Sequence, residues 1–568
     1  MRVLVAAVQF EPDQFDKPAS RERLGRLVES AAARGARLIV TPELGCSGMC
    51  WYSREEAAPL AETAPGPFTR MAEELCRRHR CYLVAGMLEV EPATGVFYNS
   101  AVLVGPGGLL GVYRKNHLFI SDLRWAAAGN RGMPVVETEI GRIGIAICAD
   151  LEFPESVRVL ALKGAQVVCC PTGWLGEKGP AATWITRAWE NRVFLVAADR
   201  WGRERGIQFA GGSCVIGTDG EIIACRDSGD GVVLAEIDLD EAGRGDGRRP
   251  ELYQRLALDS YRWPPRLFFS LYGRQPLPGG NRSAAGVLQL PPVPGGWRER
   301  LAEVARGVRL GIESHPDLKL LVLPDLGAAA GPDQAIELGG PEMGSMVELG
   351  RRHGIYLVLG VLERSGGDLY RTAVLCGPPG VVGFYRQVHR PAAPAPAEVR
   401  VGDSLDLFFD TPLGRIGLLL GEDLRYPEAA RCLALAGCDL ICVAGDGRLP
   451  LPRGLGSTRI PHPGGVPSGE DPYHWCLGRS RAWENGCYLA VANPAVDPEG
   501  AVHGYGSGVF DPLAYRRVPP PEEVITHGGE GLLVRVISTR EEDRAGREVR
   551  QKEVLRRRRT DLYTLLVK

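Results

Sequence analysis

The pentapeptide Arg187-Ala-Trp-Glu-Asn191 occurs a second time, unchanged, as Arg481-Ala-Trp-Glu-Asn485. Three other segments recur in the same order along the chain: 21–24 as 298–301, 82–89 as 356–363, and 141–144 as 414–417. Four collinear matches separated by nearly half of the chain do not arise by chance. They predict two copies of one domain, and a unit of this length is a complete globular domain rather than a solenoid repeat.

The ends of the two copies also resemble each other. The segment Arg248-Arg-Pro-Glu-Leu-Tyr253 returns as Arg558-Arg-Thr-Asp-Leu-Tyr563, and residues 262–296 between the copies are rich in Pro and Gly. Such a composition is typical of a linker that runs over the surface. We therefore predict a first domain at residues 1–255, a linker at 256–285 and a second domain at 286–568.

The composition argues against several classes of protein. Hydrophobic residues make up 45% of the 568 residues and charged residues 24%, which is ordinary for a globular chain. The formal net charge of −2 gives no reason to expect nucleic acid or a membrane surface as a partner. The chain has no apolar run of the ~18 residues that a transmembrane helix needs. Its 15 Cys follow no disulfide framework, so we expect a cytoplasmic protein with reduced thiols.

Expected strands and helices alternate along the first copy. Apolar runs predict strands at 3–10, 38–40, 82–89, 98–104, 143–148, 167–171, 194–198 and 221–225. Helical spacing predicts helices at 68–79 and 154–164, and another that Ser20 would cap and that Gly35 would end. This alternation is typical of the α/β class, in which helices cover the faces of sheets.

Three polar residues follow expected strands and could carry chemistry. Glu43 comes just after the strand at 38–40, where a partly desolvated carboxylate can act as a base. Lys115 is one of only seven Lys in the chain and could stabilise an oxyanion. Cys148 ends an apolar strand shortly before a helix, whose terminal amides favour a thiolate. Each residue alone also has a simpler interpretation: a capping Glu, a solvated Lys and a small buried Cys.

Taken together and in this order, the segments 40–44, 113–117 and 141–155 resemble the nitrilase superfamily of carbon–nitrogen hydrolases. The resemblance implies an α-β-β-α sandwich for each copy and a Glu43-Lys115-Cys148 triad. It implies that Cys148 attacks an amide-type carbon while Glu43 takes and returns the proton. Lys115 and the Ala149 amide would hold the oxyanion, and water would hydrolyse the thioester. No cofactor and no metal are implied.

Other residues near the triad carry secondary expectations. Many members of that superfamily have a second Glu a few residues after the Lys, and Asp122 is the nearest carboxylate here. Asp150 is expected to orient the loop of the nucleophile. His117 is expected to be structural, because the sequence shows no Asp partner for it. The residues after Cys148 include Glu152 and no cation, which favours a neutral or cationic amide, unless Glu152 only faces solvent or caps the next helix.

The triad positions of the second copy hold Asp325, Gln387 and Gly421. The nucleophile and its cationic partner are gone, so this copy should fold without catalysing the reaction. Because folds of this kind commonly pair across one face, we expect the two copies to pack as a pseudo-dimer. The degenerate copy would then be a built-in partner, and a higher oligomer is left open.

The expected function is hydrolysis of a non-peptide C–N bond in a small amide or N-carbamoyl amine, with water as the second substrate. Hydrolysis of nitriles is one alternative. A non-catalytic scaffold or binding protein of the same fold is another, and the complete triad of the first copy argues against it. A zinc site at Cys46, Cys50, Cys76 and Cys81 is disfavoured because the spacings are loose.

Overall fold

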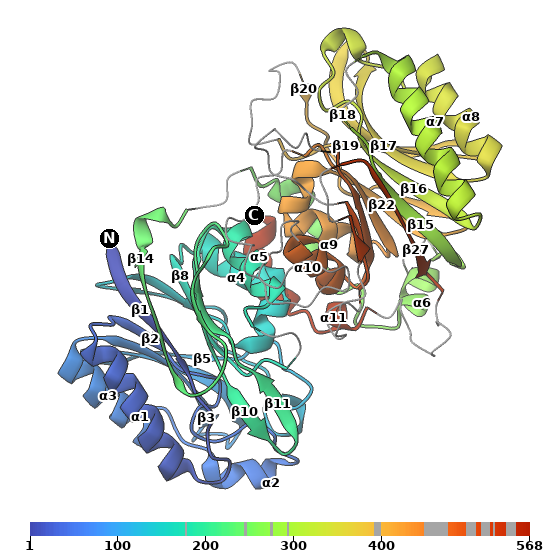
Figure 1. Ribbon diagram of the computed structural model, residues 1–568. Coiled ribbons are helices and arrows are strands. Elements are labelled where there is room, and N and C mark those ends of the chain that lie inside the picture. The colour runs from blue at the N-terminus through green and yellow to red at the C-terminus, as the bar shows by residue number, and fades with distance from the viewer. Residues whose placement is uncertain are drawn as a thin grey trace.

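The computed structural model describes residues 1–175, 179–243, 247–272, 276–291, 295–390, 399–447, 475–495, 507–512, 523–525, 529–540 and 552–568. In these residues the chain forms two tandem α-β-β-α sandwiches (Figure 1). The predicted α/β class and the predicted duplication are confirmed.

In the first copy one sheet has the strand order β14-β1-β2-β3-β4-β5 and the facing sheet the order β13-β12-β9-β8-β7-β6. The strands are β1 (Arg2–Gln9), β2 (Leu38–Val40), β3 (Tyr82–Val90), β4 (Phe97–Gly105), β5 (Gly108–Arg114), β6 (Val135–Thr138), β7 (Gly141–Ile145), β8 (Val167–Thr172), β9 (Phe194–Asp199), β12 (Ser213–Ile216), β13 (Ile222–Arg226) and β14 (Gly231–Asp238), with a separate hairpin of β10 (Trp201–Glu204) and β11 (Ile207–Ala210). The helices are α1 (Lys17–Ala33), α2 (Arg54–Ala57), α3 (Pro67–His79), α4 (Pro154–Leu162) and α5 (Ala182–Asn191).

The second copy repeats this plan, with the sheets β19-β18-β17-β16-β15-β27 and β21-β22-β23-β24-β25-β26. Its strands are β15 (Arg282–Gln289), β16 (Leu318–Asp325), β17 (Tyr356–Ser365), β18 (Asp368–Gly377), β19 (Gly380–Arg386), β20 (Val399–Arg400), β21 (Phe408–Thr411), β22 (Gly414–Leu420), β23 (Leu440–Ala444), β24 (Tyr488–Ala492), β25 (Gly508–Phe510), β26 (Glu523–Val524) and β27 (Gly531–Ser538). The helices are α6 (Pro265–Leu267), α7 (Trp297–Ser314), α8 (Pro341–His353), α9 (Pro427–Leu435), α10 (Trp475–Asn485) and α11 (Glu553–Arg556).

The layers follow from the apolar pattern of the strands. The strand β8 reads Val-Val-Cys-Cys-Pro-Thr and is buried along its whole length, as expected of a parallel strand covered on both faces. Helices α1 and α3 cover the sheet that contains β1, whereas α4 and α5 cover the sheet that contains β8 (Figure 1). Parallel strands of both sheets end at one edge, and the loops that follow β2 and β7 meet there.

The start of α1 differs from the prediction. The cap is Asp16, whose side chain accepts from the Ala19 amide at 3.0 Å. Ser20 lies within the first turns and is buried, and its hydroxyl donates to the Asp13 carbonyl, so it cannot cap the helix. The predicted stop is confirmed: Gly35 follows the last turn with a φ of 94°, a conformation that glycine adopts without strain.

The segment expected to link the copies is partly packed. Tyr261 and Phe269 are buried, with ring centroids 5.9 Å apart. The first strand of the second copy, β15, begins at Arg282. This part of the segment therefore contributes to the core instead of running free over the surface.

The two copies pack through α4 and α5 on one side and α9 and α10 on the other (Figure 1). The repeated pentapeptides meet there, and their charged side chains form a closed ring with no exposed surface. Arg481 contacts Glu484 at 2.8 Å and Glu190 at 2.6 Å, and Arg187 contacts the same two carboxylates. Because loss of one member would leave a buried charge without its partner, this contact needs the pentapeptide in both copies.

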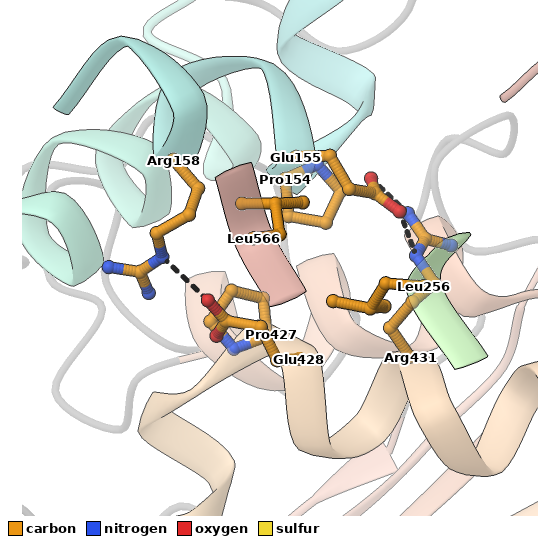
Figure 2. Close-up of a pocket in the computed structure, with 8 residues that line it drawn as sticks. All are labelled: Pro154, Glu155, Arg158, Leu256, Pro427, Glu428, Arg431 and Leu566. Carbon is orange, nitrogen blue, oxygen red and sulfur yellow. Dashed lines mark hydrogen bonds and ion pairs between the residues drawn. The ribbon is translucent and has the colours of Figure 1, made fainter. Parts of the chain in front are cut away.

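A small pocket lies on the same pseudo-two-fold interface (Figure 2). Equivalent residues of the two copies line it in pairs: Pro154 and Pro427, Glu155 and Glu428, Arg158 and Arg431, and Leu256 and Leu566. Two ion pairs cross the interface here, from Arg158 to Glu428 and from Arg431 to Glu155, each at 3.0 Å. The pocket is thus closed by charges that already have partners, and it is a feature of the packing between the copies.

Candidate active site

The three predicted triad residues lie on loops at one edge of the first sandwich. Glu43 follows β2, Lys115 follows β5, and Cys148 begins a short 3-10 helix, Cys148–Glu152, after β7. The side chains of Glu43 and Lys115 are 0% exposed, and Cys148 is 5% exposed. The site is therefore screened from bulk water, which strengthens electrostatic interactions inside it.

Lys115 connects two carboxylates. Its Nζ donates to Glu43 Oε1 and to Asp122 Oδ2, both at 2.7 Å. Burial alone would lower the pKa of Lys115, but the charges of Asp122 and Glu43 outweigh it and raise this pKa well above its ordinary value. Lys115 is thus held as a cation. The structure brings Asp122, the possible second carboxylate, into direct contact with Lys115 of the expected triad.

Asn99 is a site residue that the sequence did not reveal. From β4, its Nδ2 donates to Glu43 Oε1 at 2.7 Å and to Asp122 Oδ1 at 3.2 Å. Glu43 Oε1 therefore accepts from two donors, whereas the buried Oε2 has no hydrogen-bond partner in the described part of the chain. One oxygen of the carboxylate is anchored and the other is available for proton transfer.

The backbone around the site is strained at two positions. Cys148 has a φ of 45° and Leu44, directly after Glu43, a φ of 50°. Residues with a Cβ rarely adopt this left-handed conformation, and such strain gathers at functional sites. Gly86 of β3 allows the Glu43 loop to approach, because a Cβ there would lie 2.5 Å from the Pro42 carbonyl oxygen and 2.8 Å from Glu43 Cα.

The electrostatics of Cys148 differ from the expectation that a thiolate is favoured. Burial and the charge of Glu43 raise the pKa of the Cys148 thiol well above its ordinary value. Lys115, the Thr172 hydroxyl and the Gly173 amide act in the opposite direction and do not compensate. This shift favours the protonated thiol. Thr172 and Gly173, at the end of β8, are further residues beside the nucleophile that the sequence did not reveal.

Asp150 lies at the centre of a buried hydrogen-bond network. It accepts from the Ile147 amide at 2.9 Å, from the Tyr113 hydroxyl at 2.7 Å and from the His117 amide at 3.0 Å. Burial alone would raise the pKa of Asp150, but the hydrogen bonds and the charge of His117 lower it below its ordinary value. This geometry agrees with an orienting role for Asp150. Ala149, the expected oxyanion donor, is buried in the same turn.

The reason for expecting a structural His117 is wrong, and so are both simpler interpretations of Glu152. His117 has an Asp partner after all, since its Nδ1 lies 2.8 Å from Asp150 Oδ1, although the two residues are far apart in sequence. Glu152 neither faces solvent nor caps a helix. It is buried and accepts from Arg557 Nη2 at 2.7 Å. The charge of Glu152 is used in this pair, so it no longer argues for a neutral or cationic substrate.

The equivalent place in the second copy is filled by another ion cluster. Arg371 occupies the position in β18 that Asn99 occupies in β4. Arg371 pairs with Leu362 of β17, and Asn99 pairs with the equivalent Leu88 of β3. Arg371 Nε donates to Asp325 Oδ2 at 3.1 Å, and its Nη2 lies 3.5 Å from Asp446 Oδ2. A Cβ on Gly421 would lie 2.7 Å from Asp446 Oδ1. Arg371 and Asp446 therefore take up space that the first copy leaves to the side chains of the expected triad.

In the described ranges no group of three or more His, Cys, Asp or Glu is placed to hold a metal ion. All 15 Cys are free thiols. No helix among the described residues combines the length and the apolar character needed to span a bilayer.

Comparison with known proteins gives the same family for both copies. The family model "Carbon-nitrogen hydrolase" matches residues 4–245 and 285–522. A nitrilase of Pyrococcus abyssi is 38% identical over 239 residues, which are 42% of this chain and 90% of the relative. The N-carbamoylputrescine amidase of Solanum lycopersicum is 32% identical over 293 residues, which cover 45% of this chain and 94% of the relative. The crystal structure of an amidase from Nesterenkonia sp. is 26% identical, with a TM-score of 0.39, over 44% of this chain and 95% of that chain.

Each relative thus covers less than half of this chain, whereas the family model matches it twice and accounts for most of its length. The chain belongs to the carbon–nitrogen hydrolase family, the nitrilase superfamily, as a tandem duplication.

Proposed function

We propose that the first copy hydrolyses the C–N bond of a small amide or an N-carbamoyl amine, and that the second copy does not catalyse this reaction. One observation carries the proposal. Lys115 Nζ lies 2.7 Å from Glu43 Oε1 and 2.7 Å from Asp122 Oδ2, in a buried site that also contains the strained Cys148. A nucleophile, a base and a fixed cation are the parts that acyl transfer through a thioester requires.

The first half of the reaction makes the thioester. The Cys148 sulfur attacks the carbonyl carbon, and its proton passes to Glu43 Oε2, the oxygen that has no hydrogen-bond partner among the described residues. The negative charge that develops on the carbonyl oxygen is stabilised by Lys115 and the Ala149 amide. Glu43 then returns the proton to the nitrogen as the C–N bond breaks, and ammonia or an amine leaves.

The second half regenerates the thiol. Glu43 takes a proton from water, the resulting hydroxide attacks the thioester, and the same oxyanion donors stabilise the new intermediate. The C–S bond breaks, Cys148 is reprotonated and the acid is released. The raised pKa of Cys148 supports this use of Glu43, because a protonated thiol needs a base at the moment of attack.

A second candidate is hydrolysis of nitriles, favoured by the relative that is named a nitrilase. The test is an ammonia-release screen of the full-length chain over primary amides, N-carbamoyl amines and nitriles, with Cys148→Ala as the control. Release from amides or N-carbamoyl amines that disappears in the control supports the proposal. Release from nitriles alone supports the second candidate. No release from any class, together with a Cys148 that resists alkylation, would favour a non-catalytic scaffold.

A further inference from the structure

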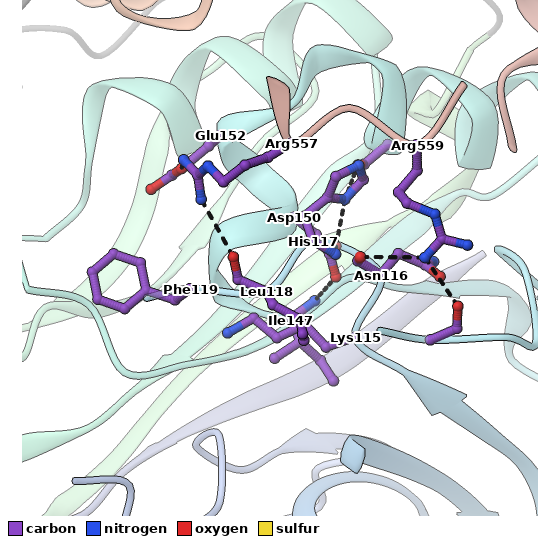
Figure 3. A network of polar contacts seen from close by, with 12 residues as sticks. Lys115, Asn116, His117, Leu118, Phe119, Ile147, Asp150, Glu152, Arg557 and Arg559 are labelled. Atoms are coloured by element: carbon purple, nitrogen blue, oxygen red, sulfur yellow. Dashed lines mark hydrogen bonds and ion pairs between the residues drawn. The ribbon is translucent and has the colours of Figure 1, made fainter. Parts of the chain in front are cut away.

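The last segment of the chain, residues 552–568, belongs to the second copy by sequence but lies against the active-site loops of the first copy. It begins with α11 and continues in short 3-10 turns. Figure 3 shows Arg557 and Arg559 of this segment above the loop that carries Lys115, His117 and Leu118. Neither arginine enters the reaction proposed above, so the contact needs an explanation of its own.

Tyr563 completes a buried chain of hydrogen bonds between the two loops. Its hydroxyl lies 2.7 Å from His117 Nε2, and the other ring nitrogen of His117 lies 2.8 Å from Asp150 Oδ1. His117 follows Lys115 by two residues, and Asp150 follows Cys148 by two residues. The Tyr563 hydroxyl thus fixes a ring that ties the loop of the cation to the loop of the nucleophile.

Two arginines of the segment make a second connection. Arg557 Nη2 donates to Glu152 Oε2 at 2.7 Å, and its Nη1 donates to the Leu118 carbonyl at 3.4 Å. One guanidinium therefore spans the helix of the nucleophile and the loop of Lys115. Arg559 Nη1 donates to the Gly129 carbonyl at 3.0 Å and to the Asn116 carbonyl at 3.5 Å, which holds the same loop from its other side.

We propose that Tyr563, Arg557 and Arg559 are positioning residues for the first active site, so that the degenerate copy supplies part of the frame in which Lys115 and Cys148 act. The inference rests on the proposed function. Its physical basis is that the loops around Lys115 and Cys148 have little regular secondary structure, and that a small displacement of reacting groups slows a reaction strongly.

The duplication provides a matched control for each contact. The first copy ends in the same way on the second copy: the Tyr253 hydroxyl lies 2.7 Å from His389 Nε2, and His389 Nδ1 lies 2.7 Å from Asp423 Oδ1. Arg249 Nη1 donates to the Val388 carbonyl at 3.2 Å and the Gly402 carbonyl at 3.4 Å. These contacts surround a site without the triad. Substitutions of Tyr253 or Arg249 therefore measure what such contacts contribute to packing alone.

Arg557 is the exception to this symmetry. The motif repeat aligns it with Gly247, the residue before Arg248, so only the contact on the first site has this arginine. Among the described residues, its two bonds, to Glu152 and to the Leu118 carbonyl, have no counterpart on the second copy. The additional cation is on the side of the molecule where both catalytic loops must be held.

The test compares Tyr563→Phe with Tyr253→Phe in the full-length chain. Each substitution removes one hydroxyl from a buried His and keeps the ring. We expect thermal midpoints that agree within about 2 °C. We expect kcat to fall about tenfold in Tyr563→Phe, with KM changed less than about twofold, because misplaced groups affect the transition state more than substrate binding. In Tyr253→Phe we expect kcat and KM to stay within about twofold of the wild type.

A second pair of variants covers the ion pair. Arg557→Met keeps the stem of the side chain and removes the charge, and we expect it to lower kcat by at least as much as Tyr563→Phe. Arg557→Lys restores a cation and should recover part of the loss. The rate at which iodoacetamide alkylates Cys148 is measured in every variant, because this rate depends on the surroundings of the thiol and not on turnover.

Equal kcat losses in the two Tyr variants, or wild-type kcat and alkylation rate in both Tyr563→Phe and Arg557→Met, would overturn the inference. Failure of the proposed function has a different signature, namely a wild-type chain that releases no product from any C–N substrate. In that case the alkylation rates alone decide the inference: a change in Tyr563→Phe but not in Tyr253→Phe supports it, and no difference between them overturns it.

Discussion

Glu43 of the first copy and Asp325 of the second follow equivalent strands, but each carboxylate meets a different kind of cation. Glu43 accepts from the terminal amine of Lys115, which follows the edge strand β5 of the same sheet, and from the neutral Asn99. Asp325 accepts from Arg371, whose planar guanidinium also lies near Asp446. An Arg guanidinium that is paired with two carboxylates blocks the site. A Lys ammonium group has three N–H donors, so when two of them bind carboxylates one donor remains for a substrate oxygen.

The backbone shows the same contrast. In the first copy Leu44 and Cys148 are held in the left-handed region. Their counterparts in the second copy are Leu326 and Gly421, and both lie outside it, although Gly421 could adopt it at no cost. The supporting network differs little, since Asp150 with His117 and Asp423 with His389 have nearly equal geometry. At these two positions the left-handed conformation is thus found in the first copy and not in the second, while the hydrogen-bonded frame around them is present in both copies.

The largest effect is expected from removal of the nucleophile. Cys148→Ala should reduce turnover by about 10⁴-fold or more, because the thioester cannot form, and a small residue should leave the fold intact. The measurement is ammonia release, with circular dichroism to verify folding. Cys442→Ala, on the equivalent sheet of the second copy, is the control and should leave kcat unchanged. A Cys148→Ala enzyme with wild-type turnover would refute the mechanism.

The next comparison concerns the carboxylates of Glu43 in the first copy and Asp325 in the second. Glu43→Gln should lower kcat by ~10²- to 10⁴-fold, the range typical of a lost general base. Asp325→Asn should leave kcat within about twofold, but it should reduce the free energy of unfolding by roughly 1–3 kcal/mol, because buried Arg371 loses a charged partner. Steady-state kinetics and urea unfolding of both variants separate the two effects. Similar kcat losses in both variants would show that the second site is not inert.

For the Glu43→Gln variant, the pKa of Cys148 predicts that alkylation of Cys148 becomes faster although turnover becomes slower. Glu43→Gln removes a negative charge that raises this pKa, so the pKa should fall and the thiolate fraction at about pH 8 should rise. Alkylation of Cys148 by iodoacetamide should then be several-fold faster than in the wild type although turnover is lost. The measurement is the alkylation rate over a pH series. A rate that falls together with turnover would mean that Glu43 also deprotonates the thiol for alkylation.

The smallest effect is expected from an attempt to rebuild the second site. Asp325→Glu, Gln387→Lys and Gly421→Cys together should give no turnover in a Cys148→Ala background, because Arg371 and Asp446 still fill the site. Further substitution of Arg371→Asn and Asp446→Gly, which copies Asn99 and Gly173, should be needed before any ammonia release is seen. Activity in the triple variant would show that the pocket of the second copy remains functional.

Several site residues could not be found in the sequence because their partners are distant along the chain. Asn99 reaches Glu43 only through the register of β4 against β3, and a single Asn in an apolar strand carries no local signal. His117 was expected to have no Asp partner, yet Asp150 is brought to it when β7 packs beside the β5 loop. The pKa of Cys148 was expected in the wrong direction, since burial and the charge of Glu43 outweigh Lys115, the Thr172 hydroxyl and the Gly173 amide.

The sequence by itself determined the duplication, the α/β class and the positions of Glu43, Lys115 and Cys148 at the ends of strands, because repeats, apolar periodicity and strand boundaries are local patterns. Only the tertiary structure decided what surrounds them. It placed Asp122 against Lys115 and Asn99 between Glu43 and Asp122, filled the second site with Arg371, and brought Tyr563 against His117. Those contacts depend on sheet register and on the packing of one copy against the other, and neither is encoded in any short segment.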